Sequence, residues 1–128
     1  MALEVGLQAA LIHVVSDDDT ALAVGSGDVA VLATPRLLAL AEAACIAALA
    51  DAGLPPGSTT VGTRVEIEHL LASSVGETVR VAARLEHLDG RLLRFEVVAT
   101  DDGDRLLGRA IATRVLVDRE RFLARTGH

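Results

Sequence analysis

Residues 37–50 form the longest apolar stretch of the chain, and only Glu42 interrupts it. The flanking residues are typical of helix ends, because Thr34 can cap the N-terminus, Pro35 suits the first helical position and Gly53 suits the position after the last turn. A helix without a polar face is normally buried inside its protein. The pattern therefore predicts one long central helix that begins at Pro35 and is followed by Gly53.

Beyond this helix the apolar positions recur with a period of two, which is typical of half-buried strands. Turn residues separate the alternating segments, and one pair, Asp89-Gly90, is a strong hairpin signal. The segments cover residues 60–71, 77–88, 91–100 and 105–118. In the first of them, six residues share the inner face: Val61, Thr63, Val65, Ile67, His69 and Leu71.

The two ends of the chain complete the expected fold. Residues 7–15 and 20–24 predict a hairpin, and residues 119–128 predict a polar tail that frays beyond Phe122. A helix that is apolar on all sides needs apolar cover, which a strongly curved sheet can supply. We therefore expect an α+β protein, one domain over residues 1–128, in which an antiparallel curved sheet of five to six strands wraps around one central helix. This is the hotdog arrangement.

The helix and the first long strand each contribute one candidate catalytic residue. A carboxylate in an apolar helix costs free energy unless it is paired, so Glu42 is either a functional acid or the partner of an arginine. His69, on the inner face of its strand, is either a core histidine or a reactive imidazole. Because the wrapped sheet turns that face toward the helix, we expect Glu42 and His69 to share one site, within a chain or across a dimer.

Thr34 and Gly62 also have structural explanations. Capping a helix is a common role for threonine, although a helix N-terminus also offers N–H donors and a positive dipole end to a thioester carbonyl or its oxyanion. Gly62 fits a bulge or a close approach of the backbone. Cys45 is expected to be inert core. No constellation includes the remaining histidines, His13, His87 and His128.

The composition limits the classes of partner and cofactor. Of the 128 residues 51% are hydrophobic, which allows a core without disulfides, and the single cysteine fits a reducing cytoplasm. The net charge of −6 argues against a nucleic-acid partner. The longest apolar stretch is too short to span a bilayer. The histidines and the cysteine lack the spacing of metal ligands, so we expect no metal and no cofactor.

Several short motifs together resemble the fluoroacetyl-CoA thioesterase family of hotdog proteins. They are Thr34 followed by Glu42-Ala-Ala-Cys45, then Val61-Gly62-Thr63, His69, and the hairpin Asp89-Gly90-Arg91. The resemblance covers residues 34–122. It implies a catalytic set of Thr34, Glu42 and His69, substrate contact at Gly62, coenzyme A as the leaving thiol, and a homodimer with active sites between the subunits.

The residues and the resemblance together indicate an enzyme that hydrolyses an acyl-CoA or related acyl thioester. Glu42 would act as general base or nucleophile, His69 would assist proton transfer, and Thr34 would position the substrate or take part in acyl transfer. Three strand arginines are candidate contacts for the phosphates of coenzyme A: Arg64, Arg91 and Arg114.

Two other functions stay open. A non-catalytic acyl-CoA-binding hotdog module would need no acid–histidine pair, so the presence of Glu42 and His69 counts against it. A hotdog hydratase acting on enoyl thioesters would use a longer strand-turn-helix motif, which the sequence lacks.

The segment before the helix bears on the acyl group. The fluoroacetyl-specific member of the family closes its pocket with aromatic residues from this segment. Here residues 29–33 read Val-Ala-Val-Leu-Ala, and the two phenylalanines, Phe95 and Phe122, lie elsewhere. We expect residues 25–33, including Val31, to form an aliphatic wall of the acyl pocket. Such a wall has no specific means to prefer fluorine over hydrogen.

Overall fold

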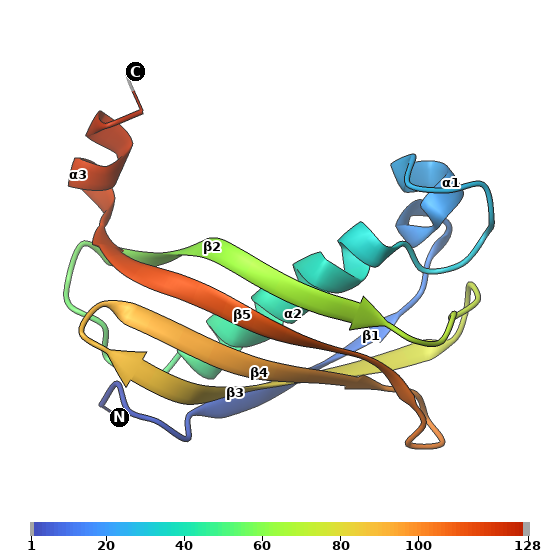
Figure 1. Ribbon diagram of the computed structural model, residues 1–128, viewed down its shortest axis with the longest axis horizontal. Coiled ribbons are helices and arrows are strands. Elements are labelled where there is room, and N and C mark those ends of the chain that lie inside the picture. The colour runs from blue at the N-terminus through green and yellow to red at the C-terminus, as the bar shows by residue number, and fades with distance from the viewer. Residues whose placement is uncertain (1, 127–128) are drawn as a thin grey trace.

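The computed structural model of the protein describes residues 2–126. Five strands form one antiparallel sheet in the order β1-β3-β4-β5-β2, and the long helix α2 lies against one face of it (Figure 1). The strands are β1 Gln8–Val14, β2 Ser58–His69, β3 Thr78–Asp89, β4 Leu92–Thr100 and β5 Leu106–Asp118. The helices are α1 Ala21–Val24, α2 Thr34–Ala48, α3 Arg119–Ala124 and the single 3₁₀ turn η1 Asp17–Asp19.

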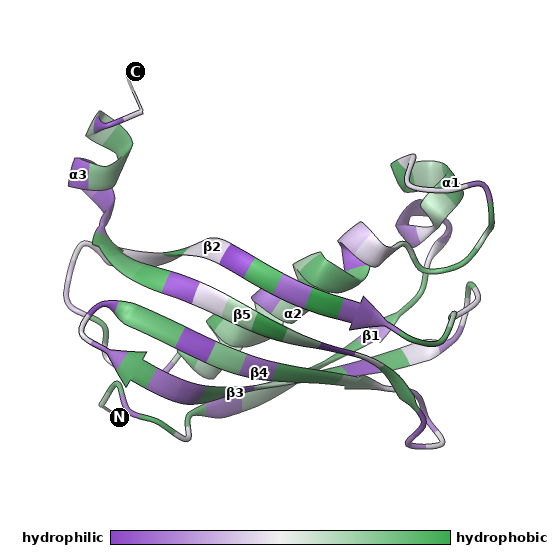
Figure 2. Cartoon of the chain, in the orientation of Figure 1, coloured by the Kyte–Doolittle hydropathy of each residue, from purple (hydrophilic) through white to green (hydrophobic). Residues whose placement is uncertain are grey.

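The core lies between α2 and the sheet. Apolar and polar residues alternate along the strands, as Figure 2 shows, so each strand presents one apolar face to the helix. The centre of the core comes from fully buried side chains of β3 and β4: Val79, Val81, Leu85, Leu93 and Phe95. The predicted curved antiparallel sheet around one long helix is therefore confirmed, with five strands.

The predicted N-terminal hairpin is wrong. Residues 21–24 form the one-turn helix α1, and β1 pairs with β3 rather than with a neighbouring strand. Thr20 caps α1, because its side chain accepts a hydrogen bond from the Ala23 N–H at 3.2 Å, and Gly25 ends the helix at a φ of 84°. Periodicity cannot tell so short an apolar run in a helix from one in a strand.

The end of the long helix and the C-terminal tail also differ from the prediction. α2 ends at Ala48, and Gly53 follows in a separate turn with a φ of 64°. The expected frayed tail forms α3 instead, because the Asp118 side chain accepts a hydrogen bond from the Arg121 N–H at 2.9 Å and caps this helix. His128 lies outside the described residues. No helix within residues 2–126 is long and apolar enough to cross a membrane.

A β-bulge divides β2 into two parts. The register between β2 and β5 shifts between Gly62 and Arg64. Beyond the bulge, the inner face predicted for residues 65–69 is confirmed. Before it, Gly62 faces the helix, because a β-carbon there would meet the carboxylate of Glu42. The inserted residue reverses the alternation, so Thr63, which was predicted on the inner face, is exposed. Leu71, also predicted there, is exposed because β2 ends at His69.

One side of α2 is left partly uncovered by the residues that the structure describes. Ala39 and Ile46 are exposed on this helix, Ile46 to 54%, and Glu42 and Ala43 between them are only partly buried. A single sheet therefore covers most of the apolar helix but not all of it. β2 is also an edge strand, because it ends the order of the sheet. An exposed apolar helix face and an open strand edge are both features that proteins normally cover.

Candidate active site

Thr34 and His69 meet at one end of α2. Thr34 is the first residue of α2, and His69 is the last residue of β2. The Thr34 hydroxyl lies 2.8 Å from His69 Nδ1, within hydrogen-bond distance. The prediction of Thr34 as an N-cap is wrong, because Ala33 occupies that position and makes no side-chain cap. The threonine hydroxyl therefore orients the imidazole rather than the helix end.

The buried surroundings of His69 favour the neutral form of its imidazole. Burial lowers its pKa from the ordinary histidine value of about 6.5, and a weaker interaction with the backbone of Leu71 acts in the opposite direction. Its Nε2 atom is buried and has no hydrogen-bond partner among residues 2–126. A neutral imidazole held at Nδ1, with no hydrogen bond at Nε2, can accept a proton in a reaction and pass it on.

Glu42 and Arg114 form an ion pair near the middle of α2. Arg114 Nη1 donates to Glu42 Oε2 at 3.0 Å, while its Nε and Nη2 donate to the side chain and the backbone carbonyl of Thr60, each at 2.9 Å. The Arg114 side chain is only 7% exposed and that of Glu42 is 31% exposed. Arg114 was expected as a solvent-facing phosphate contact, and that placement is wrong. It is instead the buried cation that fixes the Glu42 carboxylate.

Gly62 lies directly opposite this carboxylate. A β-carbon at Gly62 would overlap Glu42 Oε2 and would lie 3.3 Å from Arg114 Nη1. Gly62 is paired with Arg114 across the ladder between β2 and β5, which holds its backbone in place. The glycine thus leaves room for the carboxylate at this point of the strand.

The chain does not bring Glu42 and His69 together. Within residues 2–126, Glu42 bonds to Arg114 and the His69 ring to Thr34. Thr34 and Glu42 are eight residues apart on α2, and at 1.5 Å per residue the helix rise separates them by about 12 Å. The described chain therefore carries two separate groups, Thr34 with His69 and Glu42 with Gly62 and Arg114.

A cavity of about 290 Å³ adjoins Thr34 and His69. Its lining includes Val29, Val31 and Ala33 from the segment that leads into α2, which is the wall expected from the sequence. The other two candidate phosphate contacts lie on the surface. Arg64 is 72% exposed and pairs with Glu66 at 2.7 Å, and Arg91 is exposed at the hairpin between β3 and β4.

Cys45 is buried beside the Glu42–Arg114 pair, and it is fully covered, as expected for core. Burial raises the pKa of its thiol to about 12, although the charge of Arg114 acts in the opposite direction. Such a thiol is not a nucleophile at neutral pH. Among residues 2–126, no group of three or more His, Cys, Asp or Glu side chains could hold a metal ion.

One polar cluster near the site could not be predicted from the sequence. His13, Ser16 and Arg36 all contact the buried carboxylate of Asp19. Asp19 lies in a run of three aspartates that reads as an ordinary turn, and no spacing rule connects that run to a histidine in a strand or to an arginine in a helix.

The solved structures that this chain resembles define its class. The fluoroacetyl-CoA thioesterase FlK superposes with a TM-score of 0.90 at 30% identity, over 98% of this chain and 96% of that chain. A hot-dog-like protein from Thermanaerovibrio acidaminovorans superposes with a TM-score of 0.85 at 23% identity, over 95% and 89%, which shows the fold. The protein is thus a hotdog-fold thioesterase, as the sequence predicted.

The sequence comparisons identify the family. The chain belongs to the fluoroacetyl-CoA-specific thioesterase family, which matches it over residues 15–120. The fluoroacetyl-CoA thioesterase of Streptantibioticus cattleyicolor is 36% identical to it over 95 residues, which are 74% of this chain and 67% of that protein. The predicted family and enzyme class are confirmed, and neither the hydratase nor the non-catalytic alternative is favoured.

We predict that Gly62→Ala lowers thioester hydrolysis on the order of 10- to 100-fold while the protein stays folded. The new methyl group displaces the flexible end of Glu42, so the helix and strand can keep their places while the carboxylate moves. Steady-state kinetics and thermal unfolding measure the two effects. Gly103→Ala is the control, because its nearest atom would be Asp101 Oδ1 at 3.5 Å. Equal activity of the two variants would contradict the role of Gly62.

We also predict that His69 makes folding stability depend on pH. Because its folded pKa lies below its unfolded pKa, the stability is fully present above about pH 6.5 and is lost as the pH falls toward the folded value. Chemical denaturation of the wild type and His69→Gln at about pH 7.5 and pH 5.5 measures this. The wild type should lose more stability on acidification than the variant. Equal losses would show that His69 titrates like an exposed histidine.

Proposed function

We propose that the protein is a homodimeric acyl-CoA thioesterase whose active site combines Thr34 and His69 of one subunit with Glu42 and Gly62 of the other. The observation that carries this proposal is the division of the candidate residues into two groups that do not meet within a chain. The family resemblance agrees with it, because it implies active sites between subunits.

The uncovered surfaces support a two-fold arrangement. Two copies of the edge strand β2 can pair antiparallel, which extends the sheet and removes both open edges. The same axis brings the two α2 helices together along the N-terminal part of their exposed face, which carries Ala39 and Ala43 beside Glu42. Small residues on this face allow two helices to approach closely.

The two-fold axis must lie where it brings the Thr34–His69 group of one subunit to the Glu42–Gly62 group of the other. An axis that passes between Val65 and Glu66 sets His69 of one β2 opposite Gly62 of the other. An axis at Leu38 sets Thr34 of one α2 beside Glu42 of the other. The two midpoints fit one common axis, because Thr34 contacts His69 and Glu42 lies against Gly62 within each chain. One two-fold axis therefore completes two identical sites.

The chemistry requires an ionised Glu42, which Arg114 stabilises through Oε2. The anion acts on the thioester by one of two routes. As a general base it takes a proton from water, and the hydroxide oxygen forms the new bond to the acyl carbon. As a nucleophile it forms an acyl anhydride that water then hydrolyses. Both routes break the carbon–sulfur bond and release a carboxylic acid and coenzyme A.

The Thr34–His69 pair acts on the leaving group, the thiolate of coenzyme A. The imidazole, oriented at Nδ1 by the threonine, accepts the proton released by the attacking water and passes it to the departing thiolate, or it holds the thioester in place. Arg64 and Arg91 are the remaining candidates for the phosphates of coenzyme A, because both guanidinium groups face solvent. We propose a cytoplasmic location, because the single free thiol, Cys45, fits a reducing compartment.

Thiol release from acyl-CoA substrates tests the catalytic assignment. Glu42→Gln should lower kcat by about 10²-fold or more, the scale of losing a general base, when it is measured at a temperature where the variant is folded. Its melting temperature should also fall, because the buried Arg114 loses its counter-charge. His69→Ala should lower kcat more than His87→Ala, which alters an exposed residue of β3. Activity of Glu42→Gln within a few-fold of the wild type, or equal effects of the two histidine variants, would contradict the assignment.

The aliphatic wall at Val29, Val31 and Ala33 predicts the acyl preference. An apolar pocket distinguishes substrates by only about 1–3 kcal/mol per methylene. We expect little preference for fluoroacetyl-CoA over acetyl-CoA and a higher kcat/KM for longer or bulkier acyl groups. Acetyl-, fluoroacetyl-, butyryl-, hexanoyl- and phenylacetyl-CoA form the panel. A preference for fluoroacetyl-CoA of more than roughly a hundredfold would show that this wall does not determine specificity.

A further inference from the structure

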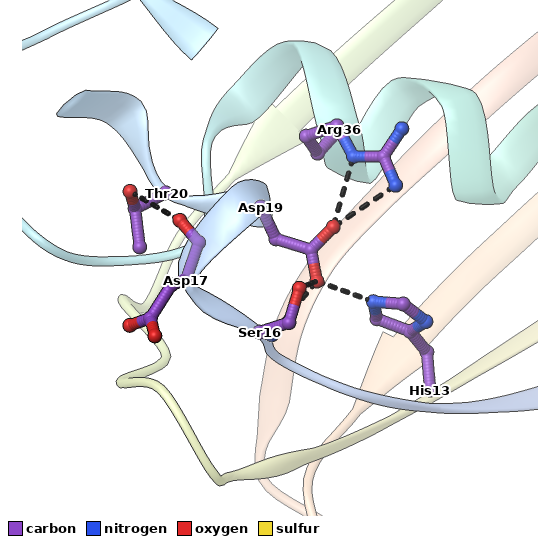
Figure 3. A network of polar contacts seen from close by, with 6 residues as sticks. All are labelled: His13, Ser16, Asp17, Asp19, Thr20 and Arg36. Atoms are coloured by element: carbon purple, nitrogen blue, oxygen red, sulfur yellow. Dashed lines mark hydrogen bonds and ion pairs between the residues drawn. The ribbon is translucent and has the colours of Figure 1, made fainter. Parts of the chain in front are cut away.

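Asp19 is a buried carboxylate outside the proposed catalytic set, and it is only 2% exposed. Both of its oxygens are occupied (Figure 3). Oδ2 accepts from the Ser16 N–H at 2.8 Å and the Ser16 hydroxyl at 3.1 Å, and it lies 2.7 Å from His13 Nε2. Oδ1 accepts from Arg36 Nε at 3.0 Å and lies 2.9 Å from Arg36 Nη2. One side chain thus connects β1, η1 and α2.

These contacts lie on both sides of Thr34. Arg36 stands in the first turn of α2, two residues after Thr34. The residue before Thr34, Ala33, donates its N–H to the backbone carbonyl of Asp19 at 2.9 Å. Asp19 therefore fixes the chain immediately before and immediately after the hydroxyl that contacts His69.

The same residue closes the segment that forms the wall of the cavity. This segment leaves η1 at Thr20, passes through α1 and residues 25–31, and returns to Asp19 at Ala33. A bridge between Thr20 and Leu32, and a hydrogen bond of 2.9 Å from the Ala21 N–H to the Val31 carbonyl, join its two ends just beyond Asp19. The two ends of the segment, and Val31 with them, thus lie next to Asp19, whose side chain connects this point to β1 and α2.

The anchor works only as an anion. Burial alone would raise the pKa of Asp19, but the Ser16 N–H, His13, Arg36 and the Ser16 hydroxyl together outweigh it and hold the pKa well below the usual range. Every group around the two oxygens can donate, so the site needs a pure acceptor. An asparagine here would replace one of the two acceptor oxygens with an amide NH₂ group, which would face other donors and could not accept from them.

We propose that Asp19 is a positioning residue for the thioesterase site: it holds Thr34 against His69 and fixes the segment that lines the acyl pocket. The inference rests on the proposed function, because the catalytic roles of Thr34 and His69 are part of that proposal. A purely structural ion pair would alter only the stability of the fold. A positioning residue alters the turnover of folded enzyme and the environment of His69.

Asp19→Asn tests the proposal, and Asp101→Asn is the matched control. Asp101 also accepts from two backbone N–H groups, those of Gly103 and Arg105, and from the Arg105 guanidinium, but it does so in the turn between β4 and β5. Asp19→Asn should lower kcat on the order of 10- to 100-fold at a temperature where the variant is folded, the scale of a misplaced catalytic group. It should also reduce the difference in kcat/KM between acetyl- and hexanoyl-CoA. Asp101→Asn should change neither.

An NMR pH titration of the His69 ring separates failure of this inference from failure of the proposed function. In Asp19→Asn the ring should lose its contact with Thr34, and its titration midpoint should shift, whether or not the enzyme hydrolyses any substrate tested. Arg36→Gln is the milder variant if Asp19→Asn does not fold, and Arg36→Lys should retain more activity than Arg36→Gln. Wild-type turnover together with an unchanged His69 titration in folded Asp19→Asn would overturn the proposal.

Discussion

The ion pair between Glu42 and Arg114 is the interaction on which the site depends. An acid on an otherwise apolar helix can lie against a sheet only if a cation or several donors compensate the lost water. Arg114 provides the cation from β5, and Thr60 of β2 holds the arginine in turn. The bulge in β2 then presents Gly62, the residue without a β-carbon, to the carboxylate. Helix, edge strand and neighbouring strand are thereby fixed relative to one another at the carboxylate.

The second constraint is the uncovered surface beside that carboxylate. α2 is apolar around Glu42, yet Ala39 and Ile46 are exposed, and β2 has no neighbour on its outer edge. The same helix and strand carry Thr34 and His69 at one end. The proposed dimer follows from both facts, because one two-fold axis covers the apolar surface and joins the complementary groups. Assembly and catalysis would then have the same structural origin.

Much of the fold could be predicted because its signals are periodic. The buried helix, the alternating strands and the inward register of His69 all follow from apolar spacing. The failures have local causes. Residues 21–24 are four apolar residues without a period, so the sequence does not distinguish the helix α1 from a strand. The bulge at Gly62 reverses an alternation that continues unbroken in the sequence. Thr34 fits an N-cap, but its hydroxyl contacts a histidine 35 residues away.

The site could be predicted residue by residue but not as a geometry. Glu42 and His69 were recognisable because each is a polar residue at an apolar position. Arg114 was not, because an arginine at an alternating position reads as solvent-facing until the partner across the sheet is known. Asp19 was missed for a related reason, since its partners come from three elements that are distant in sequence.

The central claim is that two subunits complete one site, and subunit complementation tests it most directly. His69→Ala and Glu42→Gln are each purified, mixed, and allowed to exchange subunits. A heterodimer of the two then has one site with both substitutions and one site with neither. If the site is shared, the mixture should regain up to about a quarter of the wild-type rate, since half of randomly assorted dimers are heterodimers with one intact site. If each chain builds its own site, every site carries a defect, and a mixture no more active than its components would contradict the account.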